Sequence, residues 1–164
     1  MSADKVRLGV RDLLAAVVGI GTVDTAALDV RAAPQKLRAL TANPYWSVTI
    51  SRMQDQPATF GAGSSTRPVF RFYEVRVEGW RGFVAASEVT TDWERLVDGV
   101  LHRLEVSQAA LAQILLGVGL SGFIALEDVR AEELGIREIT EGDKSYRAHH
   151  AVITARARVY QVLS

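Results

Sequence analysis

The sequence predicts an α+β fold in which an antiparallel or mixed β-sheet, with one long-loop hairpin, packs its helices on one face. Three observations support this prediction, and each concerns the spacing of apolar side chains. Residues 67–84 and 145–162 alternate with the period of two of a half-buried strand, and residues 91–104 repeat at helical spacings of three and four. These patterns predict a sheet with one apolar side and an amphipathic helix that covers that side.

Length and composition are those of one globular domain, which we expect to span residues 1–164. Of the residues, 48% are hydrophobic and 23% charged, as in proteins with a single core. The 19 basic and 19 acidic residues cancel, so no attraction of the whole molecule to nucleic acid or acidic membranes is expected. The absence of cysteine excludes disulfides, thiolate metal sites and cysteine nucleophiles. Charges within the first fourteen residues argue against a secretion signal.

The chain is predicted to begin with an amphipathic helix over residues 4–18, because Val6, Val10 and Leu13 fall on one helical face. Gly19 and Gly21 supply the left-handed conformations that end helices, and a short extended segment follows them. We expect the connection after it to end in a short helix over residues 34–40, which Pro34 begins.

A second strand is predicted over residues 45–53, where Trp46 and Val48 alternate with polar side chains. The segment 54–67 that follows is much longer than the usual hairpin loop of about two to five residues. We interpret it as an arm with Phe60 and Arg67 as candidate partner-contact residues, the alternative being an insertion without a role. Its GAGSST motif lacks the lysine of a phosphate loop, so no nucleotide site is expected.

The strand over residues 67–84 places Tyr73, Val75 and Val77 on one face. Phe70 and Phe72 are out of phase with this pattern. The strand therefore either buries both faces at that end or carries a bulge near Tyr73.

The clearest helix covers residues 91–104, and Thr91 and Glu94 fit a capping box at its start. The following run, residues 106–126, has no charge and is long enough in principle to cross a bilayer. Its glutamines and glycines favour instead a helix to Leu116, a glycine break and a short strand from Phe123, buried in the core or between subunits. GVGLSG in this run matches GxGxxG, but a helix precedes it and no βαβ unit follows, so no dinucleotide site is expected.

The last part is predicted to contain a short exposed helix over residues 127–135, capped by Gly135, and a closing strand over 145–162. His149 and His150 are neighbours in that strand and point to opposite faces, so they cannot share a metal ion. Arg156 and Arg158 share the outer face and are the candidate lumen-facing or interface residues, where they could meet phosphates; a solvated face is the alternative.

Catalytic patterns are missing from the sequence. It contains no HExxH, no GxSxG and no complete phosphate loop, and it brings no histidine and carboxylate together by spacing. We therefore do not expect an enzyme, and we expect no cofactor and no metal.

In this order the elements resemble those of the tail terminator, or tail completion, proteins of long-tailed bacteriophages and related tailed particles. The features that carry the resemblance span most of the chain: the helix VRDLLAAVV running into GIGTVD, the strand PYWSVTISR, the long loop before RPVFRFYEVRVEGW, the helix DWERLVDGVLHRL and the strand YRAHHAVITARARV. The uncharged run 106–126 and the acidic stretch after it are less typical of the family.

The resemblance implies a structural protein that forms a ring, usually a hexamer, caps the tail tube, stops its polymerisation and joins the tail to the head. Its partners would be copies of itself, the tail tube protein and a head or neck completion protein, with DNA passing through the ring and no membrane involved. It would be assembled in the host cytoplasm and reside at the head–tail junction of the virion. Two alternatives stay open: a head-side neck or connector protein, and a small cytoplasmic α+β ligand-binding or adaptor domain.

Overall fold

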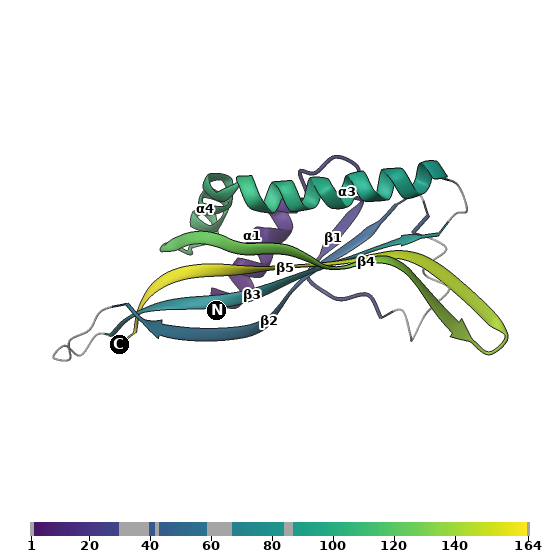
Figure 1. Ribbon diagram of the computed structural model, residues 1–164. Coiled ribbons are helices and arrows are strands. Elements are labelled where there is room, and N and C mark those ends of the chain that lie inside the picture. Colours follow the sequence, from purple (N-terminus) through teal and green to yellow (C-terminus); the bar gives the residue numbers. More distant parts are fainter. Residues whose placement is uncertain (1, 30–39, 42, 59–66, 84–86, 164) are drawn as a thin grey trace.

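The computed structural model describes residues 2–29, 40–41, 43–58, 67–83 and 87–163 (Figure 1). In chain order its elements are α1 (Ser2–Leu14), β1 (Thr22–Asp24), β2 (Tyr45–Pro57), β3 (Arg67–Gly82), α3 (Ser87–Val106), α4 (Gln108–Gly117), β4 (Phe123–Glu141) and β5 (Lys144–Leu163).

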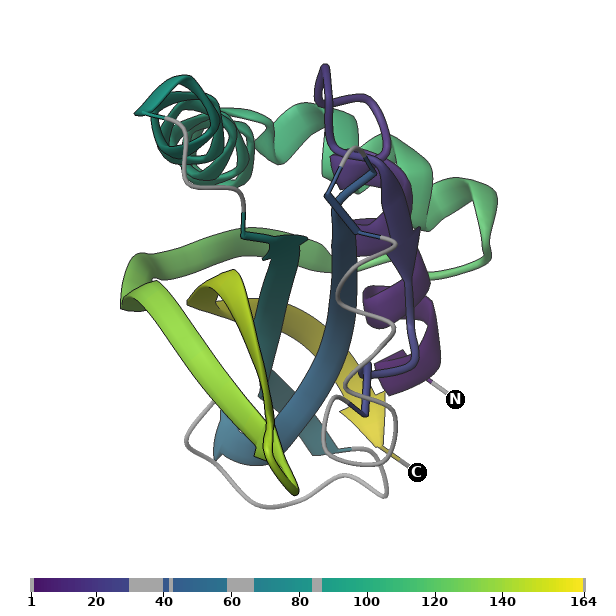
Figure 2. The ribbon, with the colours of Figure 1, turned by 90° about the vertical axis from the view of Figure 1, so that its right-hand side faces the viewer.

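The strands form one mixed sheet in the order β1-β2-β3-β5-β4, in which β1 pairs parallel to β2 and the other pairs are antiparallel. Helices α1, α3 and α4 lie against one face of it, with α1 along β2 and α3 and α4 above the sheet (Figure 2). The predicted α+β fold with helices on one face is therefore confirmed.

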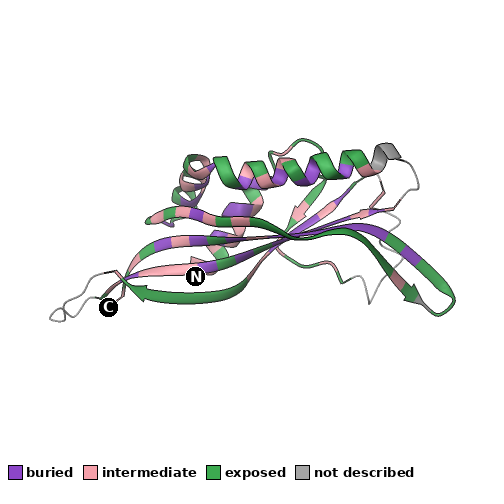
Figure 3. Ribbon diagram, viewed as in Figure 1, coloured by how far each residue is buried: buried purple, intermediate pink, exposed green. Residues whose placement is uncertain are grey.

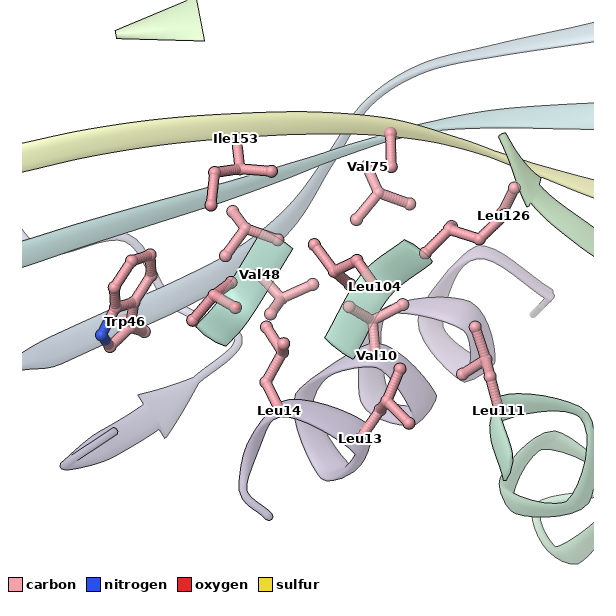
Figure 4. Packing of buried hydrophobic residues seen from close by; sticks show 14 of the residues in the cluster. Val10, Leu13, Leu14, Trp46, Val48, Val75, Leu104, Leu111, Leu126 and Ile153 are labelled. Atoms are coloured by element: carbon pink, nitrogen blue, oxygen red, sulfur yellow. The ribbon is translucent and has the colours of Figure 1, made fainter. Parts of the chain in front are cut away.

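Alternation along the strands divides the sheet into two faces, which we call the covered face and the open face. Val48, Val77 and Ile153 lie in register on the covered face, and all three are fully buried beneath the helices. Figure 4 shows Leu14 of α1 and Leu104 of α3 among the side chains that fill the space between helices and strands. Burial of this apolar surface is the main force that holds the two layers together.

The open face carries polar side chains over most of its length, and a smaller apolar cluster lies at one end. In that cluster Trp80, Tyr146 and Ala148 are buried, with Leu28 and Leu40 packed against them. Leu28 and Leu40 therefore cover part of the open face near Trp80. The predicted helix over residues 34–40 lies outside the described residues apart from Leu40, which is in a turn.

Alternation in β3 is uninterrupted, because β3 pairs with β5 without any register shift. Val69 and Tyr73 are buried on the covered face, and Phe70 and Phe72 are half-buried on the open face. Of the two alternatives for this strand, partial burial of both faces is the one observed. The bulge lies on the partner strand β2, next to Ser51.

Three predicted boundaries are wrong. Helix α1 ends at Leu14 rather than at residue 18, although Gly19 and Gly21 do take positive φ angles of 78° and 77°. Strand β2 runs on to Pro57, so the predicted long loop begins later than residue 54. Helix α3 begins at Ser87, which places Thr91 inside the helix and removes the predicted capping box; no proline or glycine lies between them to stop the helix earlier.

The uncharged run 106–126 folds as predicted into a helix, a glycine break and a strand. Helix α4 ends at Gly117, Gly119 and Gly122 take positive φ angles of 83° and 87°, and β4 begins at Phe123. Within the described parts of the chain, no helix combines the length and apolar character needed to cross a membrane. One side of the run is core and the other is solvent-exposed; the buried residues are Leu111, Leu115, Leu120 and Leu126, and the exposed ones include Leu116, Val118 and Ile124.

The predicted helix over residues 127–135 is wrong, because this segment is the middle of β4. Register shifts against β5 occur at Phe123/Ala125, Glu127/Arg130 and Ala131/Glu133. Each shift adds a residue out of step, so the apolar residues lose the period of two by which a strand is recognised.

Candidate functional site: the charged centre of the open face

The predicted residues Arg156 and Arg158 lie on the open face at the centre of the sheet, as the alternation of β5 indicated. Strand pairing places Arg156 between Glu74 of β3 and Glu127 of β4. Directly opposed side chains in antiparallel strands are close enough to interact, so a charged row crosses these three strands.

Both arginines form ion pairs with the same carboxylate. Nη2 of Arg156 lies 3.2 Å from Oε2 of Glu127, and Nη2 of Arg158 lies 3.0 Å from its Oε1. Asp128 adds a second carboxylate, 3.5 Å from Arg156. The positive charge of the two arginines is therefore balanced within the chain itself.

Aromatic rings support the same two guanidinium groups from the side of β3. Arg156 lies 4.7 Å from the centroid of the Phe72 ring, and Arg158 lies 5.8 Å from that of Phe70. Tyr160 packs edge-on against Phe70 at 5.9 Å. Cation–π contacts of this kind hold arginine side chains flat on the sheet.

A bulge in β4 creates a shallow hollow beside this row. Asp128 has a φ angle of 52°, in the left-handed region that aspartate tolerates better than most residues. The hollow has a volume of about 190 Å³ and is lined by Glu74, Asp128, Arg130, Thr154, Ala155 and Arg156. Next to it, the hydrogen bond from Arg130 and then that from Thr154 lower the pKa of Glu132.

The two adjacent histidines lie on opposite faces as predicted, and both are buried. On the open face, Nε2 of His150 lies 3.0 Å from Oε2 of Glu78, and the His150 ring packs 4.0 Å from the Trp80 ring. Burial raises the pKa of Glu78, but hydrogen bonds from His150 and Arg76 outweigh it, so the pKa lies below its ordinary value.

On the covered face, the His149 ring lies between Phe83 and Trp93, at 5.4 and 6.0 Å between centroids. Its Nε2 is buried without a hydrogen-bond partner in the described structure. Burial first, and then the charge of Arg81, lower its pKa against a smaller effect of Glu94, so the neutral ring is favoured.

Of the two predicted residues of the arm, Phe60 lies outside the described residues, and Arg67 is the exposed first residue of β3. Arg67 pairs with Leu163 near the end of β5. Close by, Arg71 donates two hydrogen bonds of 2.6 and 2.8 Å to Asp55, and these lower the pKa of Asp55. This ion pair joins β2 to β3 at the base of the arm.

A second, larger hollow of about 510 Å³ lies on the helix side. It is formed by the turn after α1, Pro44 just before β2, the end of β3 and one side of α3, and its lining includes the charged residues Arg81, Asp92 and Arg95. The sequence offered no signal for this site, because its residues come from distant segments.

The open face combines paired arginines and carboxylates with aromatic rings beside them. Among the described residues, no three histidine or acidic side chains are grouped so that they could hold a metal ion. Sequence reasoning found the arginines but missed their partners Glu127 and Asp128, because the local sequence predicts a helix there.

No protein-family model matches this chain, and no curated protein matches its sequence. The proposals that follow therefore depend on the residues and geometry described above.

Proposed function

We propose that the protein is a structural component of a tailed particle: a tail terminator that forms a ring, caps the tail tube and joins it to the head. The resemblance of the element order motivates this proposal. Balanced net charge and a contact surface without a catalytic group are consistent with a protein whose role is assembly.

The observation that carries the proposal is the outer end of β2. Residues Ser51 to Pro57 are all exposed, although they are paired with β3 (Figure 3). A strand with both faces in solvent contributes little to the core of its own chain. Met53, with 55% of its surface exposed, shows that apolar surface is included. Together with the start of β3, this segment extends past the helices, as an arm that reaches a neighbouring subunit or tube would (Figure 1).

The ring can be tested with the purified protein by light scattering behind a sizing column. A hexamer-sized species, or a monomer that becomes one as concentration rises, is the expected result. Electron microscopy of the particles provides the functional test, because loss of a terminator should give tails of uncontrolled length. Tails of normal length without the protein would contradict the proposal.

The arm can be tested separately. Deleting residues 60–65 should leave the unfolding midpoint unchanged but prevent tails from joining heads. Val18→Ser is a suitable control, because Val18 is 94% exposed and lies on the helix side, away from the arm. Particles of normal infectivity from the deletion would exclude a role for the arm.

The hollow on the helix side favours a second candidate function, that of a small ligand-binding or adaptor domain. Its two arginines, Arg81 and Arg95, would suit an anionic group. Under this alternative, small anions such as inorganic phosphate should raise the melting temperature, and Arg95→Ala should remove the effect.

A further inference from the structure

Among the strands that the structure describes, β4 is the last of the sheet and pairs only with β5, so its outer edge has no partner strand there. Residues 133–138 of this strand are all exposed, in the hairpin that projects past α3 (Figures 1 and 3). Leu134 and Ile136 are 56% and 47% exposed and lie on the same side of the strand. A regular, apolar, unpaired edge is a template for another strand.

The five residues Glu133 to Arg137 have a self-complementary order: acid, aliphatic, glycine, aliphatic, base. If two copies of this segment pair antiparallel with Gly135 opposite Gly135, then Leu134 faces Ile136 of the second copy. Glu133 then faces Arg137 of the second copy, and each contact occurs twice. Opposed aliphatic pairs and opposed charge pairs are the cross-strand pairs that stabilise antiparallel strands.

We propose that two copies of this chain associate through their β4 edges, antiparallel and with a two-fold axis at Gly135, so that the two sheets join into one. A contact of this kind is isologous, since both copies use the same surface. Within one chain, Nη1 of Arg137 already lies 3.8 Å from Oε2 of Glu133, across Gly135. Association exchanges two such exposed pairs, one in each copy, for two pairs between the copies.

Gly135 provides an independent argument. Its φ angle is not positive, and a Cβ added there would meet nothing within 4 Å, so nothing in the described chain requires a glycine. Glycine inside a strand weakens it, and it often marks a place where another backbone approaches closely. The two-fold axis of the proposed dimer supplies that second backbone.

The register has like charges at its ends, where Glu132 would approach Glu138 of the second copy. Each of these carboxylates is already hydrogen-bonded within its own chain, Glu132 to Arg130 and Thr154 and Glu138 to Ser145. The ladder is therefore short, centred on five residues, and a weak dimer is expected. This inference does not rest on the proposed ring, whose neighbouring subunits would meet through two different surfaces.

Charge reversal tests the register directly. Glu133→Arg and Arg137→Glu should each weaken dimerisation about tenfold or more, because each places two like-charged pairs opposite one another. An equimolar mixture of the two variants should dimerise again, since the two arginines of one chain then face the two glutamates of the other. Glu105→Arg, an exposed reversal on α3, is the control and should change nothing. Light scattering from about 10 μM to about 1 mM covers the range of weak association.

A cysteine at Gly135 gives a second, independent test, because the natural chain has no cysteine. Residues on the axis of an antiparallel pair have Cα atoms about 4.5 to 5.5 Å apart, within the range that a disulfide spans. Gly135→Cys should therefore form a linked dimer under mild oxidation, and Glu105→Cys should not. Glu133 also contacts His150, so Glu133→Arg could disturb folding by removing that contact. The cysteine test does not depend on Glu133 and applies in that case too.

Several results would overturn the proposal. The proposal is wrong if the wild-type protein stays monomeric up to about 1 mM. It is also wrong if the mixture of the two charge-reversal variants does not recover the dimerisation that each variant alone has lost. Equal cross-linking of the two cysteine variants would also contradict it. Since the ring would use other surfaces, a wild-type hexamer that gives no larger, β4-linked species as concentration rises would exclude the β4 contact and leave the ring intact, so the two proposals fail separately.

Discussion

The covered and open faces of the sheet differ although they are built from alternate residues of the same strands. Val48, Val77 and Ile153 are fully buried on one side, whereas the next residues, Thr49, Arg76 and Thr154, are half-buried or exposed on the other. A buried aliphatic side chain contributes about 1.5 to 3 kcal/mol, and an exposed ion pair about 0 to 1 kcal/mol. Stability is therefore concentrated on the covered face, and the open face can change with little cost to folding.

The largest expected effect follows from removing an aromatic side chain of the covered face. Trp46 is fully buried and stacks on Trp93 at 5.3 Å between ring centroids. Trp46→Ala should lower the free energy of unfolding by about 3 to 5 kcal/mol, because it leaves a large cavity. Tyr160→Ala, at a side chain 41% exposed on the open face, should change it by about 1 kcal/mol or less. If urea unfolding shows the same loss of free energy for Trp46→Ala and Tyr160→Ala, stability is not concentrated on the covered face.

Replacing either of two glycines with alanine should change the free energy of unfolding, but in opposite directions. A Cβ on Gly79 would lie 2.6 Å from ring atoms of Trp46, which is fully buried and cannot move aside. Gly79→Ala should therefore cost about 1 to 3 kcal/mol through overpacking. Gly135→Ala meets no atom and should stabilise the monomer by about 0.4 to 1 kcal/mol. The urea midpoints, measured at a concentration where the chain is monomeric, should shift in opposite directions.

The covered face could be predicted from the sequence because burial leaves a periodic signal. Val75 and Val77, or Val97 and Val100, are recognisable from spacing alone. The open face lacks such a signal. The partners of Arg156 depend on which residues of β4 stand opposite it, and bulges near Glu127 shift that register. Local patterns cannot show a bulge that arises from pairing with a distant strand, so the acidic stretch around Glu127 predicts a helix instead.

The pH dependence of stability should reveal the buried state of His149. Because the pKa of His149 is lowered in the folded state, the unfolded chain binds the proton more readily. Stability should therefore fall as the pH decreases from about 8 to about 5, through and below the ordinary value for histidine. Glu78, also with a lowered pKa, loses its contribution only below the ordinary carboxyl range, outside this window. His149→Phe should make the profile flatter, and Val18→Ser, at an exposed site without a titratable group, should leave it unchanged.

The smallest effect on stability, and the sharpest test of the open face, concerns Arg156 and Arg158. Their ion pairs are partly exposed, so replacing either arginine with alanine should cost about 1 kcal/mol or less. Because Glu127 and Asp128 already balance their charge, we expect no binding of the wild-type protein to duplex DNA at about 0.15 M salt. The double variant Glu127→Gln, Asp128→Asn should bind DNA in fluorescence anisotropy, with an affinity that falls steeply as salt is added.

If the wild-type protein binds duplex DNA with a steep salt dependence, the carboxylates do not neutralise the basic surface that binds it. If Arg156→Ala and Arg158→Ala then removed that binding, the two arginines would contact phosphates despite their carboxylate partners, as a lumen-facing position requires. If they did not remove it, the DNA site would lie elsewhere on the chain. In either case the measurement separates an arginine that holds the sheet together from one that faces a channel.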